Sequence, residues 1–264
     1  MREMADQLSS AIGRTTASVG ARDAQRVGRR WRQAARAIGR QILLVTLVTP
    51  LAVLFLMPWA WMLSTAGKAT ELIWRMPPVW IPPQYHLENF PEAWRMGDFG
   101  RYYLNTFFVC TVSVVAVTAS STLAAYAFAR IAFPLREALF VLVLSTMMLP
   151  AQVTLIPRYI LFQRLGWIDS MRPLIIPAWF GSAFDIFLLR QFFLTIPREL
   201  DEAAILDGCD YFSILWRIIL PLAKPALVTV IAFSIVGTWN DFMGPLIYLK
   251  SMQHSTLALG IYLF

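Results

Sequence analysis

Five long apolar stretches dominate this chain and limit what it can fold into. Three of them, residues 41–67, 104–129 and 138–157, contain no charged residue, and two more, residues 173–189 and 226–249, contain one acid each. A helix needs about 17–25 mostly apolar residues to cross a bilayer, and each stretch with its flanks can supply them. Because these stretches are continuous rather than alternating, they exclude a transmembrane β-barrel and predict helices, which satisfy their own backbone groups.

We therefore predict an all-α, polytopic membrane helix bundle. The expected spans lie at about residues 42–64, 104–129, 138–157, 173–194 and 226–249. Hydrophobic residues make up 58% of the chain and charged residues only 15%, well below the roughly 25% of a soluble domain. The predicted organisation is a basic tail over residues 1–40 followed by a membrane domain over residues 41–264.

The distribution of positive charge predicts the orientation of the chain. Residues 1–40 carry nine arginines and three acidic residues, so we expect this tail to stay on the cytoplasmic side. The following loops then alternate, with residues 67–103 and 157–172 outside and residues 130–137 and 190–224 inside. The tail supplies most of the net charge of +7. It is better explained as an anchor at anionic lipid than as an arm for nucleic acid, and no nucleic-acid partner is expected.

Motifs for catalysis or metal binding are missing from the sequence. There is no Gly-rich loop with a phosphate-binding lysine, no Gly-x-Ser-x-Gly and no His-Glu-x-x-His. The two histidines and two cysteines lack the spacing of metal ligands. We expect no catalytic residue, no metal site and no cofactor.

A compact polar segment, residues 197–225, separates the last two apolar stretches. Pro197 suits the first position of a helix, and the acidic residues that follow complement the positive end of the helix dipole. Gly208 is a natural left-handed stop. The pattern predicts a short helix over residues 197–207, followed by a second helix that ends near Pro221. This segment could be an ordinary surface helix-turn-helix or a docking site for another protein.

The small side chains on one face of the first helix would suit a docking site, although the pattern alone does not decide between the two interpretations. Residues spaced at i, i+3, i+4 and i+7 share a face, and two alanines there allow another surface to approach the backbone closely. The residues on this face are Leu200, Ala203, Ala204 and Asp207.

The segment resembles the EAA loop of binding-protein-dependent ABC importer permeases. The residues that carry the match are Glu202, Ala203, Ala204, Asp207, Gly208, Leu220 and Pro221. Residues 187–193 and 239–242 are similar to the carbohydrate-uptake class, near the shorter type of maltose and glycerol-3-phosphate permease. The resemblance covers about residues 42–264.

This resemblance implies a type I ABC importer permease core that forms half of a pathway for a sugar or sugar-like solute. The loop is expected to couple the chain to one of two separate ATPase subunits, which hydrolyse the ATP, so the chain itself is not an enzyme. The other implied partners are a second permease subunit in a heterodimer, an extracytoplasmic solute-binding protein and the lipid bilayer of a bacterial inner membrane. The family core has six spans, so we expect this sequence to lack the last one.

Polar residues within the apolar stretches are candidates for the solute pathway, because ionisable groups at membrane depth are costly and commonly functional. The candidates are Trp239, Asn240, Asp241 and Asp185. An aromatic face beside an amide and a carboxylate suits a sugar; helix–helix hydrogen bonding or an outer gate is the alternative. Two other functions stay open: an ABC permease for a non-sugar solute such as a polyamine, and a secondary transporter or membrane enzyme.

Overall fold

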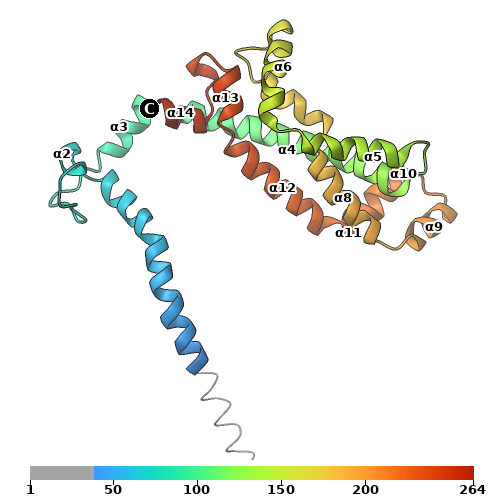
Figure 1. The fold of residues 1–264 in the computed structure, drawn as a ribbon, viewed down its shortest axis with the longest axis horizontal. Coiled ribbons are helices and arrows are strands. Elements are labelled where there is room, and N and C mark those ends of the chain that lie inside the picture. Colours follow the sequence, from blue (N-terminus) through green and yellow to red (C-terminus); the bar gives the residue numbers. More distant parts are fainter. Residues whose placement is uncertain (1–38) are drawn as a thin grey trace, which may run out of the picture. The chain divides into compact units, whose positions relative to one another are not determined.

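The computed structural model describes residues 39–264, and these residues form helices and connecting segments without a β-strand (Figure 1). The predicted all-α class is confirmed for this part of the chain. The predicted basic tail, residues 1–40, lies almost entirely outside the described residues. The described residues divide into two compact units, which meet in the sequence between Phe90 and Pro91.

The first unit contains one long helix and a loop that folds back on its end. The helix covers Gly39–Ala66 and coincides with the first predicted span, and its apolar side chains are not buried within the described residues. A short helix α2 (Thr70–Ile73) follows. The Asn89 side chain donates to the carbonyls of Ala66 and Lys68 at 3.1 and 3.0 Å. Trp80 meets Trp61 edge to face at 4.9 Å, so the loop is fixed to the helix end at two points.

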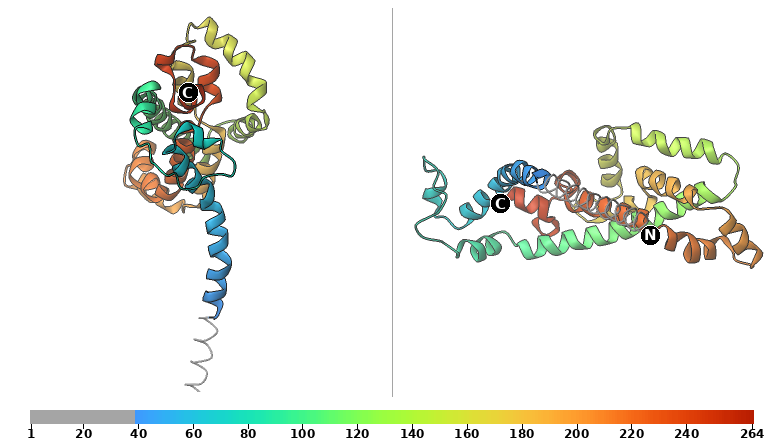
Figure 2. Two further views of the ribbon diagram at one scale, coloured as in Figure 1. Left: turned by 90° about the vertical axis from the view of Figure 1, so that its left-hand side faces the viewer. Right: turned by 90° about the horizontal axis from the view of Figure 1, so that it is seen from below.

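The second unit is built around α4 (Phe99–Arg130), which follows α3 (Asn89–Met96). Helix α4 packs along α8 (Ala183–Thr195) and α12 (Lys224–Trp239), as Figures 1 and 2 show. Small side chains on the buried face of α4 allow this close approach. They include Ser113, Ala116, Ser121, Ala125 and Ala129.

A buried apolar core lies where the ends of α4 and α8 meet the segment that precedes α12. Its fully buried members include Ala129 of α4, Phe193 of α8 and Ile219, each 0% exposed. This core fixes the position of the polar segment that the sequence singles out.

The third predicted span is not one helix. Helix α5 (Arg136–Ser145) and the short 3₁₀ helix Thr146–Met148 are followed by a bend of 98° into α6 (Ala151–Arg164). Pro150 disfavours helical backbone at the residue before it, and Leu149 is accordingly extended, with ψ of 117°. The prediction of a continuous helix over residues 138–157 is therefore wrong, and α6 continues into the predicted loop that starts at residue 157.

The fifth predicted span also breaks. Helix α12 ends at Trp239, and a separate helix α13 (Met243–Tyr248) follows, so a helix over the whole of residues 226–249 is wrong. Pro245 has no N–H to donate to the carbonyl of Asp241, which a continuous helix would require. The Asp241 carboxylate instead accepts the Gly244 N–H at 3.1 Å and starts the new helix.

The fourth predicted span, residues 173–194, corresponds to α7 (Arg172–Ile175), a 3₁₀ helix (Ile176–Phe180) and α8. It is also not one regular helix, because Gly181, with φ of +79°, and the extended Ser182 separate the 3₁₀ helix from α8. A further 3₁₀ helix (Met252–His254) and α14 (Leu257–Leu263) follow α13. Within residues 39–264, three helices can cross a membrane by length and composition: Gly39–Ala66, Phe99–Arg130 and Arg172–Thr195. The number rises to the predicted five if each of the two bent pairs counts as one span.

Candidate functional site

The polar segment begins with the short helix α9 (Glu199–Leu206), which lies at one end of the bundle (Figure 1). A short helix is confirmed here, with three acidic residues in its first turn, but its predicted bounds of 197–207 are too wide. Pro197 lies before the N-cap residue Arg198, so its prediction as the first helical residue is wrong. Gly208 adopts φ of +83°, as predicted for a left-handed stop. Its N–H donates to Ile205, and the Cys209 N–H donates to Ala204, which is the Schellman arrangement at a helix end.

The two alanines of α9 do not share one exposed face. Ala204 is only 6% exposed and belongs to the buried core, whereas Ala203 is exposed. The prediction that both present a docking surface is therefore wrong for Ala204. The exposed side of α9 carries Leu206, which is 89% exposed, together with Glu202 and Ala203.

The second helix of the segment runs from α10 (Tyr211–Ile214) through a π-helical turn (Leu215–Ile219) to α11 (Leu220–Leu222). The Asp210 carboxylate accepts the Ser213 N–H at 3.2 Å and caps this helix. Hydrogen bonding to Ser213 lowers the pKa of Asp210 below its ordinary value. Leu220 and Pro221 directly precede the 82° bend into α12, which agrees with the predicted end of this helix.

The apolar residues of the second helix point to two sides. Leu215 and Ile219 are buried in the core, whereas Phe212 and Trp216 are each 59% exposed and their rings meet at 6.1 Å. The segment thus shows apolar side chains at its surface on both of its helices.

Arg130 joins this segment to the bundle, and the sequence analysis did not single it out. Its side chain is 3% exposed and lies 3.0 Å from the Asp201 carboxylate on α9. The position of an arginine at the very end of a long apolar stretch is the one signal that could have drawn attention to it.

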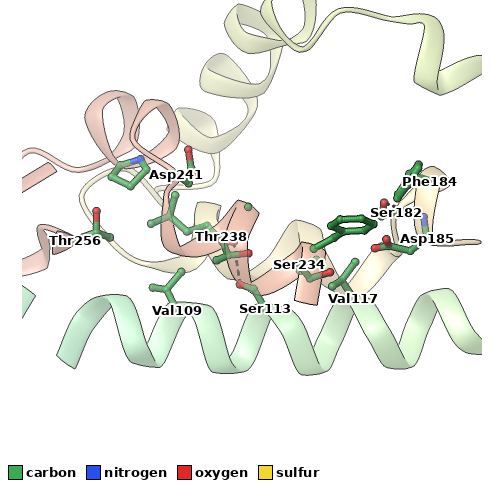
Figure 3. A pocket seen from close by; sticks show the side chains of 15 residues that line it. Val109, Ser113, Val117, Ser182, Phe184, Asp185, Ser234, Thr238, Asp241 and Thr256 are labelled. Carbon is green, nitrogen blue, oxygen red and sulfur yellow. Dashed lines mark hydrogen bonds between the residues drawn. The ribbon is translucent and has the colours of Figure 1, made fainter. Parts of the chain in front are cut away.

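A cavity of about 390 Å³ lies between α4, α8 and α12. Figure 3 shows its polar side chains coming from helices far apart in the sequence. The polar residues that line it are Ser113, Ser182, Asp185, Ser234, Thr238, Asp241 and Thr256.

Two of the four predicted pathway residues line this cavity. Asp185 and Asp241 do so, although they are far apart in the sequence. Trp239 instead packs its ring against Tyr103 at 5.6 Å, and the Asn240 amide donates to Val236 of its own helix at 2.8 Å. The sequence prediction treated residues 239–241 as successive positions of one helix. Because α12 ends at Trp239, these three residues do not lie on one helix.

The two carboxylates have different surroundings. Asp185 is 5% exposed in the first turn of α8, where its N–H donates to Ser182 Oγ at 3.4 Å. Asp241 is exposed in the short break between α12 and α13. The cavity therefore lies between the N-terminus of α8, which favours negative charge, and the C-terminus of α12.

The cavity combines hydrogen-bonding groups with aromatic surface. Phe184 and Phe233 both line it, and their ring centroids lie 6.1 Å apart. Among its lining residues, all in the described part of the chain, there are two acids and no lysine or arginine. Over residues 39–264, no group of three or more His, Cys, Asp or Glu side chains could hold a metal ion.

Comparisons with known proteins point to membrane transport. Residues 116–258 match the family model described as the binding-protein-dependent transport system inner membrane component. The chain is 36% identical over 212 residues to a probable ABC transporter permease, YurM, of Bacillus subtilis, covering 78% of this chain and 69% of that protein. It is 33% identical to the sn-glycerol-3-phosphate transport system permease UgpE of Yersinia pestis, covering 72% and 69%.

Two further similarities agree with this picture. The diacetylchitobiose uptake system permease NgcG of Streptomyces coelicolor is 29% identical, over 74% of this chain and 64% of that protein. A solved bacterial ABC transporter involved in the import of the acidic polysaccharide alginate has a chain with a TM-score of 0.74 and 26% identity. This match covers 84% of the present chain and 78% of that one. These findings confirm the resemblance that the polar segment carries.

Proposed function

The chain belongs to the family of binding-protein-dependent transport system inner membrane components, and we propose that its solute is a sugar or sugar-like compound. It is a multi-pass permease subunit of an ABC importer. In this proposal it forms half of the translocation pathway and couples to an ATPase subunit through α9. The basic tail, residues 1–40, remains in the cytoplasm.

The shape of α9 is the observation that supports coupling most directly. The helix is short and ends at a left-handed glycine, and Ala204 fixes it to the core. Its other side presents Glu202, Ala203 and the highly exposed Leu206. A small side chain beside an exposed apolar one suits close docking in a groove of a second protein.

The chemistry of the cavity supports a neutral, hydroxyl-rich solute. Carboxylates and hydroxyls accept hydrogen bonds from sugar hydroxyls, while Phe184 and Phe233 offer apolar surface to a sugar ring. The lining has two acids and no basic residue, which disfavours binding of an anionic solute. By contrast, one relative is named for sn-glycerol-3-phosphate, and the similar solved transporter is described as importing an acidic polysaccharide. A cation such as a polyamine is the second candidate, because the same two acids would attract it.

The remaining partners are proposed from the family. They are a second permease subunit in a heterodimer, two ATP-hydrolysing subunits and an extracytoplasmic solute-binding protein. No ATP-binding loop occurs in this chain, which agrees with hydrolysis on separate subunits.

The test is uptake by the assembled importer in proteoliposomes, with the binding protein outside and ATP inside. Radiolabelled neutral oligosaccharides, a sugar phosphate and a polyamine are offered in turn. Uptake of a neutral sugar that requires ATP and the ATPase subunits supports the proposal. Uptake of only the polyamine selects the second candidate, and uptake that continues without ATPase subunits indicates a secondary transporter.

Replacing Asp241 with asparagine is expected to lower sugar uptake about tenfold or more. Asparagine still caps α13, so the fold is retained, but the charged hydrogen-bond acceptor in the cavity is lost. A hydrogen bond to a charged group contributes about 1.5–3 kcal/mol. The measurement is uptake normalised to the amount of subunit in the membrane. Asn240→Ala, one residue away and outside the cavity lining, is the matched control, and an equal loss in both variants would count against the cavity.

A further inference from the structure

The guanidinium of Arg130 joins three helices. Arg130 is the last residue of α4, and its side chain is 3% exposed. One terminal nitrogen lies 3.0 Å from Oδ2 of Asp201, in the first turn of α9. The other donates to the carbonyls of Phe193 and Ile196, at 2.6 and 2.7 Å, where α8 ends. One side chain thus holds α4, α8 and α9 together.

Each of these contacts meets a physical need. The guanidinium gives the Phe193 carbonyl a second donor besides the Ile196 N–H at 3.2 Å, and a cation there complements the negative end of the α8 dipole. A charge buried to this degree is costly unless it is paired, so Arg130 and Asp201 depend on each other. Arg136, the first residue of α5, differs in this respect, because it pairs with the adjacent Glu137, whose side chain is 63% exposed.

Helix α9 is attached to the bundle at two points along its length. The ion pair holds its first turn, and Ala204 is buried in the core near its end. Only residues 196–198 connect it to α8. A shift of α9 therefore acts on the ends of α4 and α8, and these two helices also carry Ser113 and Asp185 to the cavity.

We propose that Arg130 is a positioning residue that transmits the displacement of α9 to α4 and α8, and so to the cavity. The proposal rests on the proposed function, because it requires α9 to be moved by an ATPase subunit. Arg130 touches no solute in this scheme. Its role is to keep α9 and the two cavity helices moving as one body.

The test uses the complete importer in proteoliposomes and measures solute uptake and ATP hydrolysis together. Arg130→Lys keeps the charge but has one nitrogen in place of the two that reach α8 and α9. Asp201→Asn removes the partner's charge with little change of shape. Each variant is expected to lower the amount of solute moved per ATP about fivefold or more, at a near-normal abundance of the complex. Combining the two changes should cause no further loss, because both break the same contact.

Arg136→Gln is the matched control, because it removes an arginine at the start of α5 that pairs with Glu137 rather than with α9, and it should leave solute per ATP unchanged. If uptake and hydrolysis fall in proportion in the Arg130 and Asp201 variants, Arg130 merely holds the fold and the proposal is overturned. The proposal is also overturned if neither variant assembles into the importer complex. The unmodified importer is measured as the reference. If it shows no ATP-dependent uptake, the proposed function is wrong, and this proposal is wrong with it.

Discussion

Replacing Gly208 with valine is expected to abolish ATP-driven uptake while the protein still inserts into the membrane. The residue has φ of +83°, a conformation that costs an L-residue about 1–2 kcal/mol and a β-branched one more. Nothing lies within 4 Å of the position a Cβ would occupy, so the cost is backbone strain rather than a clash. Relief of that strain re-forms the end of α9 and displaces the residues beside it. The measurement is sugar uptake with ATPase activity recorded in parallel.

Gly166 provides a matched control for this variant. It has φ of +66° and also has open space where a Cβ would lie, but it is in the loop after α6 rather than beside α9. Gly166→Val carries a similar backbone penalty and should retain most uptake. Normal uptake in Gly208→Val, with its ATPase bound, would show that α9 does not couple the two subunits.

Replacing Ala203 with tryptophan is expected to remove ATPase binding without removing the permease. Ala203 is exposed on α9, so the large ring does not disturb the core, but it occupies the surface where close docking is proposed. Loss of one central contact of an interface costs about 2 kcal/mol or more, or about a thirtyfold loss of affinity. The measurement is co-purification of the ATPase subunit with the permease from detergent extracts.

The neighbouring variant Ala204→Trp should fail in a different way. Ala204 is 6% exposed within the core, and overpacking a close-packed interior is destabilising. We expect little permease in the membrane, rather than abundant permease without its ATPase. If Ala203→Trp binds ATPase normally, or if the two variants have the same phenotype, the proposed orientation of α9 is incorrect.

Hydropathy predicted the helices that are continuous and failed where the backbone breaks. The stretches 42–64 and 104–129 are indeed helices, and for them length and apolar composition were sufficient to predict the structure. The breaks at Pro150 and after Trp239 lie inside stretches whose overall composition is as apolar as that of a span. Their causes are local: the restriction before a proline, a missing N–H at Pro245 and a capping carboxylate at Asp241.

The candidate site was predictable where a local motif defines it. Gly208 marks the end of α9 because only local backbone geometry is involved. Helical spacing groups Ala203 with Ala204 but cannot say which of them meets the core, since that depends on distant Phe193 and Ile219. The contact between Arg130 and Asp201 was unpredictable for the same reason, because it joins residues that are brought together only when α4 packs on α8.

The broken helices also determine which sides of the bundle can meet lipid tails. Around Leu149 and from Asn240 to Phe242, backbone groups leave the regular helical hydrogen-bond pattern. Acyl chains offer no donor or acceptor, and irregular backbone is not tolerated against them. At membrane depth such backbone faces water or another polypeptide, whereas an uninterrupted helix such as Gly39–Ala66 can face the tails directly. The division between the lipid-facing and the assembly-facing perimeter thus follows from the regularity of the backbone, which overall hydropathy does not reveal.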